Sequence, residues 1–228
     1  MRGTPSERET HGTVILGLTG SLGSGKSFVS SLIGLSGAAV ICADEIAREE
    51  LLPGTESFGE VVAQFGPNIV GSNGRIDRAA LATIVFSHPA KRQLLESILH
   101  PRIRARELRL LDDLRGKKAL VVLDVPLLFE GGLDQYCNHV LVVWVEEQVR
   151  RDRLHLHRGM SAEQVEARLA AQMPQSEKIS RADFLVNNSG TRPETVEQIN
   201  GVLRALFPHQ LPSELRFLDP SSDQLSHP

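Results

Sequence analysis

The chain has few cysteines, no long apolar run and no excess of basic residues. Its two cysteines, Cys42 and Cys137, are isolated and lack the spacing of a metal site or a disulfide framework, so we expect both to fill small spaces in a core. No apolar run approaches the roughly 18–20 residues that a membrane-spanning helix requires. The net charge of −3 provides no general basic field for nucleic acid. These absences favour a cytoplasmic globular protein that binds neither membrane nor nucleic acid.

The two ends of the chain differ in composition from the middle. Residues 1–12 are polar, lack the apolar segment of a signal peptide and are expected to form a disordered lead-in. Residues 208–228 are rich in Pro, Ser and Asp and are expected to form a similar polar tail. The length of 228 residues suits one α/β domain with insertions, which we place at 13–207.

Within this domain, apolar runs alternate with helical patterns. The apolar runs are continuous rather than alternating, which indicates strands covered on both faces, as in a parallel sheet between helices. The pattern predicts a doubly wound α/β fold with a five-stranded parallel sheet. The predicted strands are 14–19, 38–42, 119–124, 139–145 and 184–187, and the clearest helices are 26–35 and 193–206.

Two helical stretches contribute no strand. Residues from about 45 to 117 are expected to form several helices, one of them capped by Asp77. Pro101 interrupts the longest helical pattern and is expected to kink that helix or to start a new one. Residues from about 146 to 180 form a second helical insertion that is rich in arginine. Insertions at the carboxyl ends of strands are where α/β folds place their substrate sites.

The motif Gly20-Ser-Leu-Gly-Ser-Gly-Lys-Ser27 lies directly after a predicted buried strand and directly before a helix. Its glycines let successive backbone N–H groups point at phosphate oxygens, and the helix N-terminus adds its positive end. Lys26 is expected to reach the β- and γ-phosphates and Ser27 to coordinate Mg²⁺. A chance glycine-rich turn is the alternative, but it does not explain the strand and helix context. We therefore expect binding of a nucleoside triphosphate and phosphoryl transfer, with nucleotide contacts from Gly20, Leu22, Gly23, Ser24, Gly25, Lys26 and Ser27.

Two aspartates follow predicted strands. Asp124 ends an apolar strand, where it is either a turn or cap residue or a ligand that holds the metal through water. Asp44 follows the second strand and precedes a helix, so it is either an N-cap or a base that accepts the proton of the attacking hydroxyl. The neighbouring strand's carboxyl end faces the γ-phosphate region in a parallel sheet, and the two roles of Asp44 are compatible.

The arginines of residues 150–168 form either a solvated helix face or a cationic lid over the transferring phosphoryl group. Only Asp152 supplies an acid between Arg150 and Arg158, so charge pairing is expected to be incomplete, which favours the lid. Arg153 and Arg158 are the leading candidates for contact with phosphate.

No Asn-Lys-x-Asp segment is present, which counts against a GTPase, and two helical insertions favour a kinase of a small acceptor. Over residues from about 14 to 206, the sequence resembles the dephospho-coenzyme A kinase family. Each segment of the resemblance is weak alone, but their order and spacing are specific. The segments are 18–27, Ala43-Asp44 with Ile46-Ala47-Arg48, 74–78 with Leu81 and 84–86, 95–101, 124–130, 172–174, Glu177-Lys178, 181–183 and 187–190.

The resemblance implies ATP-dependent phosphorylation of the ribose 3′-hydroxyl of dephospho-coenzyme A, which gives coenzyme A and ADP. It implies that Lys26, Asp44 and Arg153 are catalytic, that Asp124 and Ser27 hold Mg²⁺, and that Asn188 lies by the adenine of ATP. The helical region 45–116 would bind dephospho-coenzyme A, with Asp44, Arg78, His100 and Arg102 as contacts. A monomer or weak oligomer is expected.

The sequence departs from the family pattern at two places. Phe28 stands where the phosphate loop usually continues with Thr, so any contact of that hydroxyl with the α-phosphate is lost. The family's second lid arginine aligns with His157, and Arg158 follows one place later. Two alternatives stay open: another small-molecule or nucleoside monophosphate kinase on the same fold, and a nucleotide-binding regulator without turnover.

Overall fold

The computed structural model describes residues 12–158 and 160–222 and consists of two compact units. The first unit contains the chain up to Ile41 and from Asp113 onward, and the second is Cys42–Asp112. All but the last residue of the expected lead-in 1–12 lie outside the described residues. In the described part of the chain, no helix is both long and apolar enough to cross a membrane.

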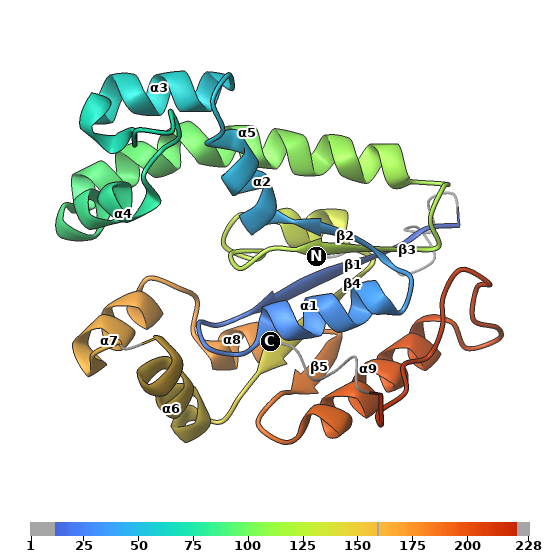
Figure 1. The fold of residues 1–228 in the computed structure, drawn as a ribbon. Coiled ribbons are helices and arrows are strands. Elements are labelled where there is room, and N and C mark those ends of the chain that lie inside the picture. Colours follow the sequence, from blue (N-terminus) through green and yellow to red (C-terminus); the bar gives the residue numbers. More distant parts are fainter. Residues whose placement is uncertain (1–11, 159, 223–228) are drawn as a thin grey trace. The chain divides into compact units, whose positions relative to one another are not determined.

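A five-stranded sheet with the order β2-β3-β1-β4-β5 forms the centre of the first unit (Figure 1). Strand β1 pairs in parallel with β3 and with β4, and β4 pairs in parallel with β5. The predicted doubly wound α/β fold is confirmed, and each predicted strand is present with its ends shifted by at most one residue. The strands are β1 (Val14–Gly20), β2 (Ala39–Cys42), β3 (Leu120–Asp124), β4 (His139–Trp144) and β5 (Phe184–Asn187).

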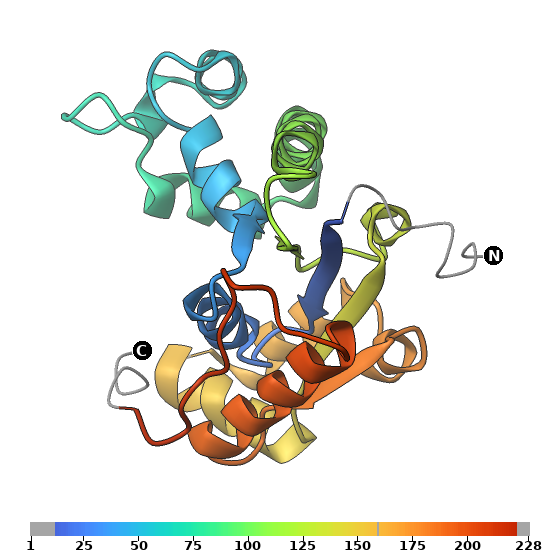
Figure 2. The same ribbon diagram turned by 90° about the vertical axis from the view of Figure 1, so that its right-hand side faces the viewer.

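Helices α1 (Lys26–Leu35) and α9 (Arg192–Leu206) cover one face of this sheet, as Figure 2 shows. Alternate strand residues such as Leu16, Leu18 and Val122 bury against them, as the two-residue repeat of a strand requires. On the opposite face Gly17 packs so closely that an added Cβ would lie 2.8 Å from Cys137 Sγ. Cys137 is buried there, so the prediction that it fills the core is confirmed.

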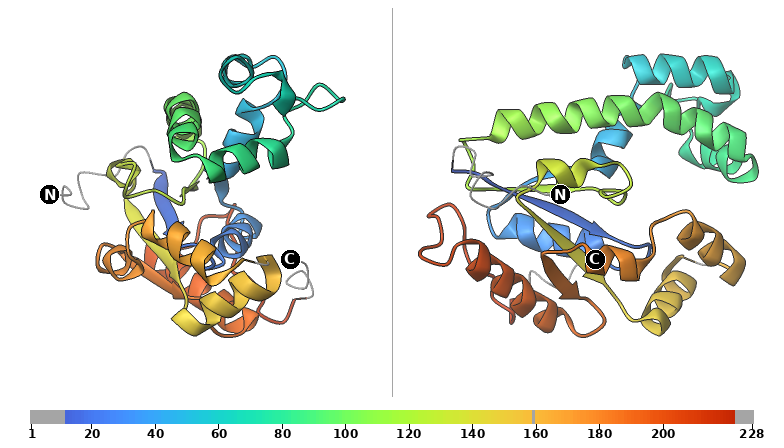
Figure 3. Two further views of the ribbon diagram at one scale, coloured as in Figure 1. Left: turned by 90° about the vertical axis from the view of Figure 1, so that its left-hand side faces the viewer. Right: turned by 180° about the vertical axis from the view of Figure 1, so that it is seen from behind.

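The second helical insertion of the first unit contains α6 (Glu147–Arg158), α7 (Ala162–Ala170) and α8 (Gln175–Ser180). Helices α6 and α7 contact each other and lie side by side in both views of Figure 3; they are called the lid below. The lid has a small apolar cluster of its own. Ser161 caps α7 in a reciprocal capping box with Gln164, which explains where this short helix begins.

The second unit is helical, with its own apolar core. Asp77 accepts hydrogen bonds from the N–H groups of Ala79 and Ala80, which confirms it as a helix cap. Helix α5 continues through Pro101, so the proposed new helix at that proline is wrong. Its helices are α2 (Ala43–Glu50), α3 (Glu56–Phe65), α4 (Arg78–Ser87) and most of α5 (Pro89–Leu114), with the short turns η2 (Pro67–Ile69) here and η3 (Leu133–Tyr136) in the first unit.

Part of the expected polar tail packs against the first unit. Leu215 is buried in the apolar core beside α1 and α9. The N–H of Leu218 donates to Asn200 Oδ1 at 2.8 Å, and the N–H of Arg216 donates to the carbonyl oxygen of Ser36 at 2.8 Å. Disorder is therefore the wrong expectation for this stretch, because its few apolar side chains find a core. Residues 223–228 lie outside the described part of the chain.

Candidate functional site

The phosphate loop, Gly20–Ser27, connects β1 to α1 at the carboxyl end of the central strand. Gly23 and Gly25 have φ angles of 79° and 81°, in the left-handed region that glycine adopts readily. Gly25 is also the N-cap of α1, so the helix begins at Lys26 as the sequence predicted. A Cβ on Gly25 would lie 2.1 Å from the side-chain nitrogen of Asn188, so the position requires glycine for space as well as for conformation.

Lys26 and Asp124 come together at the base of this loop. Lys26 Nζ donates a hydrogen bond to the carboxylate of Asp124, and the two groups form an ion pair. Both side chains are buried, with 10% and 3% of their surface exposed. Two residues 98 positions apart in sequence thus meet because the parallel strands β1 and β3 are neighbours. A buried lysine and carboxylate stabilise each other only as a pair.

The phosphate loop is held from the side by Asn188, which directly follows β5. Its Nδ2 donates to the carbonyl oxygen of Ser24 at 2.9 Å, and its Oδ1 accepts from the Thr195 hydroxyl at 3.0 Å. Asn188 is only 6% exposed. The predicted contact of Asn188 with adenine stays a prediction; the bonds observed fix the orientation of a loop peptide instead.

The lid arginines have different partners. Arg153 is half-buried, and its guanidinium donates to the carbonyl oxygen of Asn188 at 2.8 Å, which places it beside the phosphate loop. Arg151 bonds Glu147 at 3.0 Å and Glu166 at 3.1 Å, and so connects α6 to α7. The expectation that acidic partners are too sparse is therefore wrong for Arg151, because its partners lie outside the interval considered. The side chain of Arg158 lies outside the described part of the structure.

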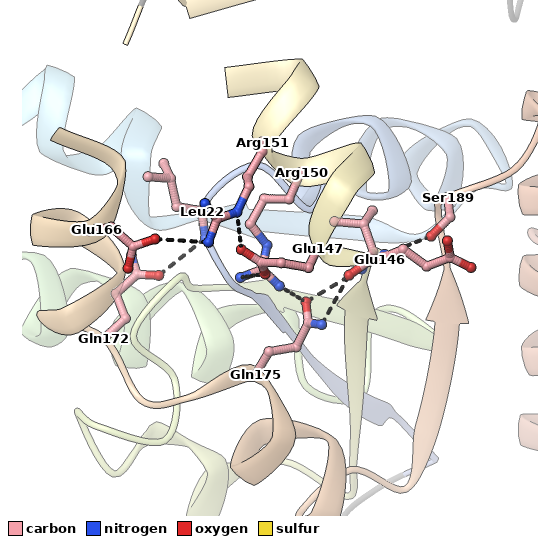
Figure 4. Close-up of polar contacts among 10 residues, drawn as sticks. Leu22, Glu146, Glu147, Arg150, Arg151, Glu166, Gln172, Gln175 and Ser189 are labelled. Carbon is pink, nitrogen blue, oxygen red and sulfur yellow. Dashed lines mark hydrogen bonds and ion pairs between the residues drawn. The ribbon is translucent and has the colours of Figure 1, made fainter. Parts of the chain in front are cut away.

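Two glutamines connect the lid with the rest of the first unit (Figure 4). The residue patterns did not single them out as site residues. Gln172 Oε1 accepts the backbone N–H of Leu22, in the phosphate loop, at 3.1 Å. Gln175 bonds both the carbonyl oxygen of Val145 at 3.0 Å and the guanidinium of Arg150 at 2.5 Å. Arg150 is 5% exposed and also pairs with Glu147 at 3.3 Å. No local pattern signals the contacts of Gln172 and Gln175, because each joins segments that are distant in sequence.

A second lysine is buried close to Lys26. Lys178, on α8, is fully buried, donates to the carbonyl oxygen of Pro126 at 2.9 Å and pairs with Glu130 at 3.1 Å. Burial lowers the pKa of Lys178; the carboxylate of Glu130 opposes this shift, and the positive charge of Lys26 adds to it. Burial acts to raise the pKa of Glu130, but hydrogen bonds from the Met173 N–H and from Lys178 outweigh it and lower that pKa.

This buried pair orders the segment after β3. The Thr19 hydroxyl also donates to the carbonyl oxygen of Pro126, at 2.9 Å. The segment that follows Asp124 is therefore held by β1 and by α8 at the same carbonyl group. Lys178 and Glu130 belong to the segments of the family resemblance, which was the one signal in the sequence that pointed to them.

Phe28 has a packing partner on each side. It lies against the apolar core of the first unit, and the Arg192 guanidinium stands 5.4 Å from the centre of its ring. The aromatic side chain at this position of α1 thus contributes to the contact of α1 with α9. Ser27, the preceding residue, is exposed on the first turn of α1.

The remaining candidates belong to the second unit. Asp44 is exposed in the first turn of α2, whose N-cap is Cys42, so the prediction that Asp44 is the N-cap is wrong. Arg78 is the exposed first residue of α4, and His100 is exposed on α5. Arg102 pairs with Glu60 at 2.8 Å and also donates to the carbonyl oxygen of Ile98.

The residues expected to hold Mg²⁺ are compatible with that ion. In the described ranges, no group of three or more His, Cys, Asp or Glu side chains forms a protein-only metal site. Magnesium in phosphate-transferring enzymes takes one or two protein oxygens and completes its shell with water and substrate phosphates. Asp124 is bonded to Lys26, and Ser27 follows Lys26 in the chain, so the residues expected to hold the ion supply a carboxylate and a hydroxyl.

Comparison with known proteins gives one consistent result. The family model of dephospho-CoA kinase matches residues 14–194. A dephospho-CoA kinase of Symbiobacterium thermophilum is 46% identical over 192 residues, which are 84% of this chain and 80% of that protein. A dephospho-CoA kinase of Geobacillus kaustophilus is 44% identical over 193 residues, 84% of this chain and 96% of that protein.

A solved structure has the same fold. The crystal structure of TT1252 from Thermus thermophilus matches with a TM-score of 0.70 and 35% sequence identity. The match covers 86% of this chain and 98% of that one. The agreement extends over both the sheet and the helical insertions, since so little of the chain is left outside it.

Proposed function

The chain belongs to the dephospho-CoA kinase family, an enzyme family of the final step of coenzyme A biosynthesis, and we propose that it transfers the γ-phosphoryl group of ATP to the ribose 3′-hydroxyl of dephospho-coenzyme A. The products are coenzyme A and ADP. The observation that carries the proposal is the phosphate loop with Lys26 buried beneath it and held by Asp124. A strand, a glycine-rich loop and a helix N-terminus in this order form an anion site for phosphates.

The reaction requires one proton acceptor and several donors of positive charge. The 3′-hydroxyl oxygen attacks the γ-phosphorus, the bond from this phosphorus to the β,γ-bridging oxygen breaks, and ADP leaves with that oxygen. Asp44 accepts the proton of the attacking hydroxyl, which needs a base because its own pKa is high. Lys26 and Arg153 stabilise the negative charge on the transferring group, the first from the loop and the second from the lid.

A bound magnesium ion would supply positive charge that offsets the negative charge developing on the phosphate groups. Ser27 would hold it directly through its hydroxyl, and Asp124 would hold it through water. Asp124 is bonded to Lys26 in the structure, so we infer that Lys26 exchanges this carboxylate for phosphate oxygens as the nucleotide binds. The phosphate oxygens then compensate the buried ammonium group that the carboxylate gives up.

The acceptor is assigned to the second unit. Dephospho-coenzyme A carries a pyrophosphate, and the exposed Arg78 offers it a charged hydrogen-bond donor. His100 and Arg102 are the further candidates; Arg102 is already held in place by Glu60. Asn188 is proposed to lie by the adenine of ATP, next to the loop carbonyl that it binds. Cytoplasmic location and a monomeric or weakly oligomeric state stay predictions.

The test is release of ADP, measured by a coupled assay with and without dephospho-coenzyme A. We expect ADP release that requires this acceptor and Mg²⁺. A panel with shikimate, nucleoside monophosphates and ribonucleosides tests the alternative of another small-molecule kinase, which predicts turnover with one of these instead. Acceptor-independent release would contradict the proposal, and so would nucleotide binding without any release, the behaviour of a regulator.

A further inference from the structure

The phosphate loop and the lid share one apolar cluster. Leu154, Met160 and Val165 of the lid region are buried together, and Leu169 packs partly against them. The remaining member is Leu22, a half-buried residue of the phosphate loop itself. The lid thus has a small core of its own, and the phosphate loop supplies one of its side chains.

Leu22 and its neighbour Gly23 have one polar and one steric contact with the lid region. The N–H of Leu22 donates to Gln172 Oε1, from the chain that follows α7, and Figure 4 shows this side chain pointing at the loop. Next to it, a Cβ added at Gly23 would lie 3.0 Å from Arg150 Cγ and 3.0 Å from Leu154 Cγ. Helix α6 therefore packs directly on the loop backbone, and α7 is tied to it through Leu22.

These contacts bear on the position of Arg153. Arg153 precedes Leu154 on α6, and Leu154 belongs to the cluster against which Leu22 packs and would lie 3.0 Å from a Cβ added at Gly23. The Arg153 guanidinium reaches the carbonyl oxygen of Asn188 at the other side of the loop. Among the described residues, only three of the lid's cluster are buried, so the loss of one apolar partner removes a large share of the contacts that fix α6 and α7.

We propose that Leu22 is a positioning residue, which holds the lid in the register that presents Arg153 to the transferring phosphoryl group. The side chain acts through the apolar cluster, and its N–H acts through Gln172. This inference rests on the proposed function, because it takes Arg153 as the lid residue that acts in the reaction.

A double-mutant cycle tests the coupling. We expect Leu22→Ala to lower kcat about tenfold, and Leu22→Met, which keeps most of the apolar volume, to restore most of that loss. In an Arg153→Ala background, Leu22→Ala should change kcat by less than about threefold. The guanidinium through which Leu22 acts is already absent from that background. Leu156→Ala is the matched control, because it truncates a leucine of α6 that is 75% exposed.

Either of two results would overturn this inference. If Leu22→Ala costs its full factor in the Arg153→Ala background, Leu22 acts on the phosphate loop alone, and the inference is wrong. A loss of kcat in Leu156→Ala equal to that in Leu22→Ala would also overturn it, because any truncation on the lid would then suffice.

Hydrogen exchange separates this inference from the proposed function. Amides of α7 should exchange faster in Leu22→Ala than in the unsubstituted protein, while amides of the central strands keep their protection, which shows that the variant is folded. Unchanged exchange in α7 would contradict a role in holding the lid. If Arg153→Ala alone keeps full kcat, the assignment of Arg153 in the reaction is wrong, and the exchange of α7 then decides whether Leu22 holds the lid.

Discussion

The two units hold their candidate residues in opposite ways. In the first unit the candidates bond to one another: Lys26 to Asp124, and Asn188 to both Ser24 and Arg153. In the second unit Asp44, Arg78 and His100 are exposed. The residues assigned to ATP are thus held by bonds to one another, and the side chains of Asp44, Arg78 and His100, assigned to the acceptor, are exposed.

This difference has a physical reason. A phosphate site built from backbone N–H groups works only if the peptide planes are fixed, and fixing them requires buried hydrogen bonds such as that of Asn188. A site for a large flexible acceptor can instead use long exposed side chains, which bind charged groups as they arrive. Substitutions on the first side should therefore abolish turnover, and those on the second should mainly change proton transfer or affinity.

Among these substitutions, removal of Lys26 should have the largest effect on turnover. Lys26→Ala should lower kcat by roughly 10³–10⁵-fold, the range for loss of a single cation in phosphoryl transfer. It also leaves Asp124 as a buried carboxylate without its partner, so thermal unfolding should be measured beside the coupled assay. Lys117→Ala, at an exposed lysine, is the control. Turnover within tenfold of the unsubstituted protein would rule out a phosphate role for Lys26.

The proposed base separates catalysis from binding in the second unit. Asp44→Asn should lower kcat by roughly 10²–10⁴-fold while the affinity for dephospho-coenzyme A is largely kept, because the amide is similar in shape but accepts no proton. Steady-state kinetics with calorimetric binding measures both quantities. Asp44 is exposed and is not the cap of α2, so folding should be unaffected. Normal turnover of this variant would show that Asp44 is not the base.

Substitution of an acceptor arginine should change KM and spare kcat. Arg78→Ala should raise the KM for dephospho-coenzyme A about 10- to 100-fold, the loss expected for one hydrogen bond to a charged group. The KM for ATP should not change. Arg75→Ala removes an exposed arginine three residues away and provides the control. Equal effects of the two substitutions would show that only the general charge of this surface matters.

A buried carboxyl in the second unit predicts a pH effect on stability. Glu107, on α5, is 2% exposed, one of its oxygens has no hydrogen-bond partner, and burial raises its pKa from 4.5 to about 7 against the opposing charge of Arg104. The folded state therefore binds a proton more tightly than the unfolded state. The free energy of unfolding should consequently fall as the pH rises from 4.5 to about 7.

Glu107→Gln removes this titration. At pH 8 it should raise the free energy of unfolding by about 2 kcal/mol, whereas near pH 5 the change should be much smaller. Denaturant unfolding at both pH values measures it, with Asp112→Asn, at an exposed carboxyl on the same helix, as the control. A stability gain that is equal at both pH values would contradict a raised pKa.

The sequence predicted the features that depend on local patterns. Five apolar runs became the five strands, the motif at Gly20–Ser27 became the strand-to-helix loop, and Asp77 became a helix cap. The pairing of Lys26 with Asp124 was also within reach, because Asp124 ends β3 and Lys26 follows β1, its parallel neighbour. Each of these follows from a periodicity or from a residue type at a fixed place in an element.

The features that the sequence did not predict depend on contacts between distant segments. Leu215 packs into the same core as α1, which lies far earlier in the chain, and the polar composition around Leu215 obscured this contact. The partners of Arg151 lie on both sides of the interval in which acids were counted. Pro101 lies inside α5, so of the two expected outcomes the start of a new helix is wrong. Burial overrides the polar composition only in the case of Leu215.

The most direct test of the account is the identity of the phosphorylated product. Purified protein, Mg²⁺, ATP and dephospho-coenzyme A should give ADP and a new phosphomonoester in equal amounts, and phosphorus NMR should place that group on the ribose 3′-oxygen. Lys26→Ala, assayed under the same conditions, should give neither product. A phosphomonoester at another position, or ADP formed with free phosphate and no phosphomonoester, would contradict the account.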